Sequence, residues 1–201
     1  MNVNKGLDRR IVRTRSMICE AFLSILHRKV YDEISVVDIA EQANINRSTF
    51  YAHFIDKEDL LDKMVADKME LLSALIHNPS DAAGLTPAFN APDPIFLTLF
   101  EHVFEYDHFY RVMLLGTTAG NFRAALNGIV RESFFIRISK LGMDQRLQVP
   151  LDVLLDYISL STCGIIERWL EGNKVYSPHH MALQLTRLAF LGVYKSMGAV
   201  E

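Results

Sequence analysis

The stretch from Ser35 to Phe54 constrains the fold most, because its apolar residues repeat as in two short helices joined by a tight turn. Ser35 can cap the first helix, with Asp38 at the third helical position to complete a capping box. Asn44-Ile45-Asn46 interrupts the pattern, since Asn tolerates left-handed backbone and Asn46 can cap a second helix. The first helix has one apolar face, which is expected to be buried: Val36, Ile39, Ala40 and Ala43.

The second helix presents a small polar face opposite its aromatic residues. Phe50 and Phe54 lie one helical turn apart and are expected to face the core. The polar side chains then point outward or to the flanks: Arg47, Ser48, Thr49 and Tyr51. Such a face suits the major groove of DNA, because Arg can grip guanine with two hydrogen bonds, Ser and Thr can read base edges, and Tyr can donate to phosphate.

Over about residues 10–65 the chain resembles the N-terminal domain of TetR-type transcriptional regulators. The resemblance rests on three segments: Ser35-Val36-x-x-Ile39-Ala40-x-x-Ala43, Ile45-x-x-x-Thr49-Phe50-Tyr51-x-x-Phe54 and Lys57-Glu58-x-Leu60-Leu61. Asn44 and Asn46 depart from the usual Gly and Ser, but Asn can adopt the turn and cap the helix. The resemblance implies that Lys57 touches the DNA backbone, which a cation beside free N–H groups could do; a solvated Lys is the alternative.

The charge distribution favours docking of the N-terminal region on DNA. Residues 1–30 carry a net charge of +5, whereas the whole chain carries −3, so the remaining residues total −8. Residues 1–9 are expected to form a flexible arm, which could follow a DNA groove or be an ordinary disordered terminus. The expected DNA contacts are Arg13, Ser35, Arg47, Ser48, Thr49, Tyr51, His53 and Lys57.

Helical periodicity predicts an all-α chain of about nine helices. Residues 1–55 would form a three-helix helix-turn-helix DNA-binding domain, and residues 56–201 a helical bundle domain for ligand sensing and dimerisation. The first helix is predicted from about Arg10 to Lys29, and a fourth runs from the cap Asp56 to about Ile76. A linker rich in Pro, Gly, Ala and Asp follows at 78–94. Later helices are predicted over residues 94–115, 122–141, 151–170 and from 178 on, with a loop at 116–121.

The last two predicted helices each carry two apolar faces, more than a body this small can bury. In the helix at 151–170 the second face comprises Val153, Tyr157, Leu160 and Gly164. We expect these helices to form a four-helix dimer interface with a second copy; a wholly intrachain core is the alternative. Candidate interface residues are Leu155, Gly164, Met181, Leu185, Ala189 and Gly192.

The C-terminal part resembles a subset of the same family found in Firmicutes-type regulators, a match that fixes no ligand. It rests on Phe100-Glu101-His102-Val103-Phe104, Phe109-Tyr110-Arg111, Gly164-Ile165-Ile166-Glu167-Arg168-Trp169-Leu170 and Ser177-Pro178.

The predicted helices at 94–115 and 122–141 carry more large aromatic residues than a tightly packed small bundle needs. This excess favours a pocket for a neutral or weakly polar, partly aromatic effector, although an aromatic stripe at helical spacing is more often plain core. Candidate ligand-binding residues are Phe104, Tyr110, Met113, Phe134 and Trp169.

Motifs of enzymes and cofactor sites are missing from the sequence. It has no nucleophile elbow, HExxH or dinucleotide fingerprint, so we expect no catalytic residue, no enzyme activity and no cofactor. Cys19 and Cys163 are expected to be reduced core thiols. A solvated helix edge, rather than a metal site, is expected for Glu101, His102, Glu105 and His108.

No apolar run of about 18 residues and no signal region occur, which predicts a cytoplasmic protein without a membrane partner. The leading hypothesis is a ligand-responsive homodimeric repressor on a palindromic double-stranded DNA operator, with an effector of unknown identity. The alternative is an activator or co-regulator whose helical body binds a protein partner. An enzyme on an all-α scaffold is a third reading, and no residue supports it.

Overall fold

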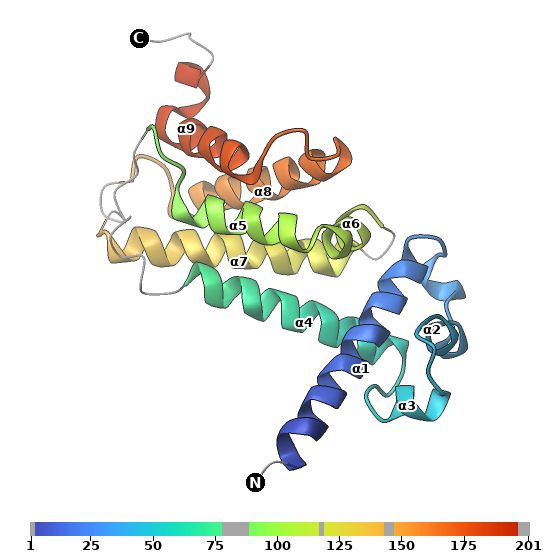
Figure 1. Ribbon diagram of the computed structural model, residues 1–201. Coiled ribbons are helices and arrows are strands. Elements are labelled where there is room, and N and C mark those ends of the chain that lie inside the picture. Colours follow the sequence, from blue (N-terminus) through green and yellow to red (C-terminus); the bar gives the residue numbers. More distant parts are fainter. Residues whose placement is uncertain (1–2, 78–88, 117–118, 143–146, 197–201) are drawn as a thin grey trace. The chain divides into compact units, whose positions relative to one another are not determined.

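The computed structural model describes residues 3–77, 89–116, 119–142 and 147–196 (Figure 1). Within these ranges every regular element is helical, which confirms the predicted fold class. The elements are α1 (Val3–Leu26), the 3-10 turn η1 (Tyr31–Glu33), α2 (Val36–Gln42), α3 (Arg47–Tyr51), α4 (Lys57–Ile76), α5 (Pro94–Glu105), α6 (Asp107–Leu115), α7 (Ala119–Lys140), α8 (Leu151–Glu171) and α9 (Pro178–Ser196). None of the described helices combines the length and the apolar character needed to cross a bilayer.

The chain divides into two compact units. The head, up to Lys68, contains α1, α2, α3 and the N-terminal part of α4. The body contains the rest of α4 and α5 to α9, over Met69 to Leu115 and from Ala119 on. Because α4 contributes to both units, the functional boundary at 55/56 stays a prediction.

The head is built around a core that α1, α2 and α3 share. Its most buried side chains are no more than 5% exposed: Ile18, Phe22, Ile25, Ile34, Ile39, Ala40, Ala43, Phe50, Phe54 and Leu60. The turn after α2 forms as predicted, with Asn44 in the left-handed region at φ 52°. Two backbone hydrogen bonds of 3.0 Å close it, from Asn44 N to Glu41 O and from Ile45 N to Ala40 O. The predicted Asn46 cap is wrong in one respect, since the backbone is extended but the side chain makes no capping hydrogen bond.

In the body α5 packs along α9 and α7 along α8, while α6 contacts both α7 and α8 (Figure 1). A buried polar network joins three of these helices. The Asp93 carboxylate pairs with Arg137 of α7 and accepts a 2.9 Å hydrogen bond from Ile95 N, which caps α5. The Asp93 backbone N–H donates to Thr186 Oγ1 of α9 at 2.7 Å. The start of α5 is therefore fixed by charge as well as by packing.

Three predicted boundaries are corrected. Helix α1 begins at Val3 and ends at Leu26, so residues 3–9 are helical rather than a flexible arm. The helix predicted over 94–115 is two helices, which separate at Tyr106 with φ −106° and ψ 34°. Periodicity missed this break because no Pro or Gly marks it and apolar residues continue through it. Helix α7 starts at Ala119 rather than Phe122.

Two predicted irregular segments fall mainly or partly outside the described residues. These are most of the linker at 78–94, of which 78–88 lie outside, and positions 117–118 of the loop at 116–121. The starts predicted for the last two helices, at Leu151 and after Ser177, agree with the structure.

Candidate nucleic-acid interface

Helix α3 carries the polar face predicted to read DNA, and two buried aromatic residues hold it in place. Phe50 and Phe54 are 0% and 2% exposed, with ring centroids 5.8 Å apart. Tyr51 is half exposed and meets Phe50 edge-on at 5.6 Å. The side chains of Arg47, Ser48 and Tyr51 are exposed, whereas Thr49 and His53 are half-buried. The short helix therefore offers a cation and two hydroxyl groups to solvent on a fixed base.

The N-terminus of α2 is fixed by a complete capping box. Asp38 N donates to Ser35 Oγ at 3.2 Å, and Ser35 N donates to Asp38 Oδ2 at 2.8 Å. The Ser35 hydroxyl also donates to Asp38 Oδ2 at 2.6 Å. The Lys29 ammonium donates to Asp38 Oδ1 at 3.0 Å. Hydrogen bonds from Ser35 and Lys29 hold the pKa of the Asp38 carboxyl well below its usual range. The hydroxyl of Ser35, a predicted DNA contact, is thus occupied within the head.

Arginine residues of α1 differ in their surroundings. Arg13, a predicted DNA contact, is exposed. The Arg15 guanidinium lies 5.1 Å from the centroid of the Phe54 ring and 3.6 Å from Asp67 Oδ2. It therefore supports the aromatic anchor of α3 by a cation–π contact. Sequence reasoning missed this role because the contact joins residues far apart in the chain.

Lys57, predicted to contact phosphate, has its ammonium directed into the head. Its Nζ lies 2.9 Å from Tyr31 O, 2.9 Å from Ile34 O and 3.3 Å from Asp32 O. It also lies 4.5 Å from the centroid of the Tyr31 ring. The side chain is half-buried. No local sequence pattern predicts these contacts, because Lys57 and its partners are more than twenty residues apart in the chain.

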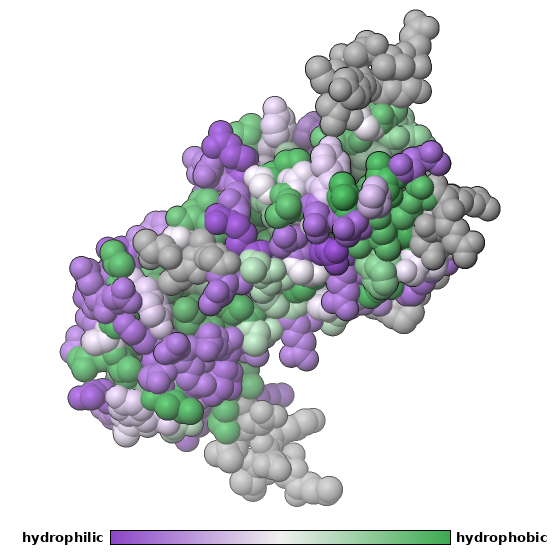
Figure 2. All heavy atoms as spheres, turned by 180° about the vertical axis from the view of Figure 1, so that it is seen from behind, coloured by the Kyte–Doolittle hydropathy of each residue, from purple (hydrophilic) through white to green (hydrophobic). Residues whose placement is uncertain are grey.

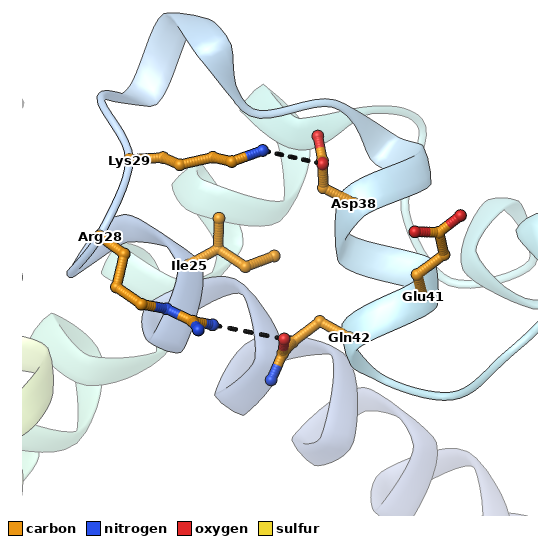
Figure 3. Close-up of a pocket in the computed structure, with 6 residues that line it drawn as sticks. All are labelled: Ile25, Arg28, Lys29, Asp38, Glu41 and Gln42. Carbon is orange, nitrogen blue, oxygen red and sulfur yellow. Dashed lines mark hydrogen bonds and ion pairs between the residues drawn. The ribbon is translucent and has the colours of Figure 1, made fainter.

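A polar pocket of about 560 Å³ opens between the end of α1 and α2 (Figure 3). Lys29 and Asp38 point toward one another across it, and Arg28 Nη2 donates to Gln42 Oε1 at 3.3 Å. Glu41 adds a second carboxylate to the lining. Because two cations face two carboxylates, the pocket has balanced charge and does not resemble an anion site.

The cluster around His102 differs in part from expectation. Glu101, Glu105 and His108 are exposed, as predicted. His102 is 2% exposed, so the prediction of a solvated side chain was wrong for it. Its ring lies 4.8 Å from the Tyr106 ring and 5.7 Å from the Tyr110 ring. Across the described part of the chain no three His, Cys, Asp or Glu residues gather as metal ligands do.

Comparison with known families assigns both parts of the chain. Residues 18–64 match the family described as bacterial regulatory proteins, tetR family. Residues 90–190, half of the chain, match a family described as transcriptional regulator C-terminal region. The chain belongs to the TetR family. It is therefore a DNA-binding transcriptional regulator with a helix-turn-helix head and a helical body.

Individual regulators match about a third of the chain by sequence, and solved structures match most of it by fold. An uncharacterized HTH-type regulator of Bacillus subtilis, YxbF, is 47% identical over 62 residues, which are 30% of this chain and 16% of the relative. The dhaKLM operon transcriptional activator DhaS of Lactococcus lactis is 35% identical over 71 residues, 35% of this chain and 36% of DhaS. The matches thus span well under half of either relative. The structure of FadR from Bacillus subtilis in complex with stearoyl-CoA has a TM-score of 0.66 at 15% identity, covering 89% of this chain and 98% of that one.

In the body of this TetR-family chain, α8 has two apolar faces, as predicted. One face is buried and includes Leu155 at 2% exposure, whereas Val153, Tyr157 and Leu160 are 55–60% exposed. Among the candidate interface residues, Leu155 and Leu185 are buried within the body itself. The others are exposed or half-buried: Gly164, Met181, Ala189 and Gly192.

Two of the candidate interface residues are glycines. A Cβ added at Gly164 would meet no atom of the chain within 4 Å. Gly192 has φ 68° and interrupts the helical backbone of α9. Exposed apolar residues lie on α9 as well as on α8, because Leu188 and Phe190 are 43% and 55% exposed. Figure 2 shows hydrophobic residues exposed on the body.

The candidate ligand-binding residues are mostly buried. Tyr110, Met113, Phe134 and Trp169 are at most 7% exposed. Phe104 is half exposed and has the Lys174 ammonium 4.6 Å from its ring centroid. The Trp169 indole N–H donates to Tyr176 O at 2.9 Å.

The hydroxyl of Tyr110 is the polar atom of this set without a hydrogen-bond partner in the described residues. Burial strongly raises the Tyr110 pKa, so the group is neutral. The buried Oγ1 of Thr162 on α8, which sequence reasoning did not single out, also has no partner there.

Proposed function

We propose that this TetR-family regulator is a ligand-responsive homodimeric repressor that binds a palindromic operator. The observation that carries the proposal is the exposed polar face of α3, held on the buried Phe50 and Phe54. Each head would place α3 in a major groove, with half-sites about one helical turn, ~34 Å, apart. Arg47 is the proposed base reader, and Tyr51 the proposed phosphate contact. Arg13, Ser48, Thr49 and His53 complete the proposed surface.

The proposed dimer forms through α8 and α9. Val153, Tyr157 and Leu160 form an apolar strip whose exposure is costly in an isolated protomer. Gly164, with open space at its Cβ position, would let a partner helix approach closely. A two-fold axis relating two such bodies would pair the two heads with the two halves of a palindrome.

The proposed effector binds among α5, α6, α7 and α8. Two buried hydroxyl groups, of Tyr110 and Thr162, have no partner in the described residues, and a ligand polar group would satisfy them. Because both are neutral, they suit a largely apolar compound with an uncharged polar end. The fold neighbour FadR was solved with stearoyl-CoA, whose acyl chain is apolar but whose CoA end is anionic, so only the acyl chain of that ligand matches this expectation. A coupling of about 1–3 kcal/mol between effector and operator would suffice for regulation.

A second candidate function is activation through a protein partner bound to the body. The relative DhaS is a transcriptional activator, which favours this function. Neither function requires a catalytic residue or a cofactor, and either would act in the cytoplasm, where bacterial DNA lies.

Selection of bound duplexes from a random DNA pool tests the proposal directly. A palindromic consensus, bound by a protein that sediments as a dimer, is expected. Release of that duplex by stearoyl-CoA or by a long-chain alcohol, abolished by Tyr110→Phe, would support the effector site. A consensus that no compound releases, together with co-purification of a defined partner bound to the body, would favour the activator function. Recovery of no enriched sequence would refute specific operator binding.

A further inference from the structure

The ammonium of Lys57 is fully engaged by backbone carbonyl groups. An ammonium has three N–H donors, and three carbonyl oxygens, of Tyr31, Asp32 and Ile34, lie within 3.3 Å of it. The Tyr31 ring adds a cation–π contact at 4.5 Å. While this arrangement persists, no N–H of Lys57 is left over for a DNA phosphate.

Helix α4 does not itself stabilise the Lys57 ammonium. Lys57 is the first residue of α4, and the N-terminus of a helix disfavours a cation. Other groups already serve that terminus, because Asp59 N donates to Asp56 Oδ1 at 2.8 Å and Ile55 N donates to Asp59 Oδ2 at 2.9 Å. The cation is therefore stabilised by the carbonyl groups of η1 and Ile34, not by its own helix.

The Lys57 contacts involve residues on both sides of the helix-turn-helix segment, residues 35–54. Ile34, 2% exposed, immediately precedes the capping residue Ser35 of α2. Lys57 follows Phe54, the second aromatic anchor of α3, by one short turn. The Lys57 contacts thus join the chain just before the helix-turn-helix to the chain just after it. The Tyr31 ring extends the link to the core through an edge-on contact with Phe22 at 6.3 Å.

We propose that Lys57 is a positioning residue that closes residues 35–54 into one rigid reading unit, instead of a phosphate contact. The inference rests on the proposed DNA-binding surface of α3, which Lys57 would hold in place without touching DNA. A flexible ammonium can meet three carbonyl oxygens converging on one point, whereas the planar guanidinium of Arg cannot reproduce that geometry. A phosphate contact, in contrast, would accept either cation.

The test compares Lys57→Met and Lys57→Arg with the unmodified full-length protein. Affinity for the selected duplex, or for a mixed-sequence duplex if none is selected, is measured across salt concentrations at a temperature where circular dichroism shows every variant folded. Arg13→Met serves as the charge-removal reference, and Lys63→Met as the matched control on the same helix. Among the described residues the Lys63 ammonium pairs with the Asp59 carboxylate at 2.8 Å and lies 5.6 Å from the centroid of the Phe54 ring.

If Lys57 is a positioning residue, both Lys57 variants lose about tenfold in affinity, the effect of one charge-assisted hydrogen bond. The slope of the logarithm of affinity against the logarithm of salt concentration, called here the salt slope, stays unchanged. Arg13→Met is expected to lower the slope by about one unit, and Lys63→Met to change neither quantity. A slope lowered by about 0.9 in Lys57→Met and restored in Lys57→Arg would show a phosphate contact and overturn the proposal. Unchanged affinity in the folded variants would also overturn it, because Lys57 would then only stabilise the fold.

Amide hydrogen exchange of the peptide covering residues 30–40 tests the contacts without DNA. Both Lys57 variants, and Tyr31→Leu to a smaller degree, are expected to speed exchange there, and combining Tyr31→Leu with Lys57→Met should add little. Unchanged exchange would overturn the proposal even if the protein binds DNA. If exchange responds but the unmodified protein binds no duplex, the DNA-binding function fails and the contacts themselves stand.

Discussion

The buried ion pair between Asp93 and Arg137 offers the sharpest stability prediction. The two side chains are 6% and 10% exposed, and the Asp93 carboxylate also caps α5 through Ile95 N. Asp93→Asn preserves the volume and an oxygen for the cap but leaves the guanidinium without its carboxylate. Breaking a buried pair in this way costs about 3–5 kcal/mol. Asp93→Ala also removes the cap, which adds about 1 kcal/mol.

Urea unfolding followed by the fluorescence of Trp169 measures this cost. Trp169 is the single Trp of the sequence and is 4% exposed in the body. With a slope of about 2 kcal/mol per molar urea, Asp93→Asn should lower the midpoint by about 1.5–2.5 M. Protein concentration is held constant, because the stability of a dimer depends on it.

The matched control is the exposed pair of Arg131 and Asp156, which joins α7 to α8 at 2.9 Å with side chains 43% and 58% exposed. Asp156→Asn should cost less than about 1 kcal/mol, because solvent screens such a pair. Asp93→Asn combined with Arg137→Met should cost less than the sum of the single changes, since the two side chains interact directly and both charges of the pair are then removed together. Equal losses of unfolding free energy in Asp93→Asn and Asp156→Asn would refute the reasoning. So would a double variant of Asp93 and Arg137 whose loss equals the sum of the two single losses.

Four further changes test the head and the body. Ser35→Ala should lower the stability of the head by about 1 kcal/mol. Because folding lowers the pKa of Asp38 from 3.8, the stabilisation from its carboxylate is present above about pH 4 and lost in acid. Thermal melts at pH 3 and pH 7 should therefore show a smaller loss of stability on acidification in Ser35→Ala than in the unmodified protein. Arg47→Ala should relax sequence preference at one position per half-site, by about 1–3 kcal/mol, and an unchanged selected consensus would remove Arg47 from the base readers. Leu160→Glu should yield monomers in sedimentation, and a persisting dimer would exclude the exposed strip of α8 as the interface. Tyr110→Phe should leave urea stability equal or higher, because it removes a buried hydroxyl without a described partner; a loss above about 1 kcal/mol would show that the hydroxyl is satisfied inside the protein.

Features that depend on neighbours within one helical turn could be read from the sequence. The capping box of Ser35 and Asp38 and the left-handed Asn44 appeared where their residue types predicted them. The inward direction of Phe50 and Phe54 followed from their spacing of four. The exposed apolar face of α8 was also predictable, because a helix with two apolar faces can bury only one against a small body.

Features that depend on long-range packing were decided only by the tertiary structure. The break at Tyr106 has no Pro or Gly to mark it. His102 is buried, and its ring contacts the rings of Tyr106, at the end of α5, and Tyr110, on α6. Asp93 meets a cation 44 positions away. The sequence around Lys57 indicated a cation at a helix start. The direction in which its side chain points depended on carbonyl groups more than twenty residues earlier in the chain. A four-carbon side chain reaches many partners from one backbone position, and only the packed fold determines which of them lies within hydrogen-bonding distance.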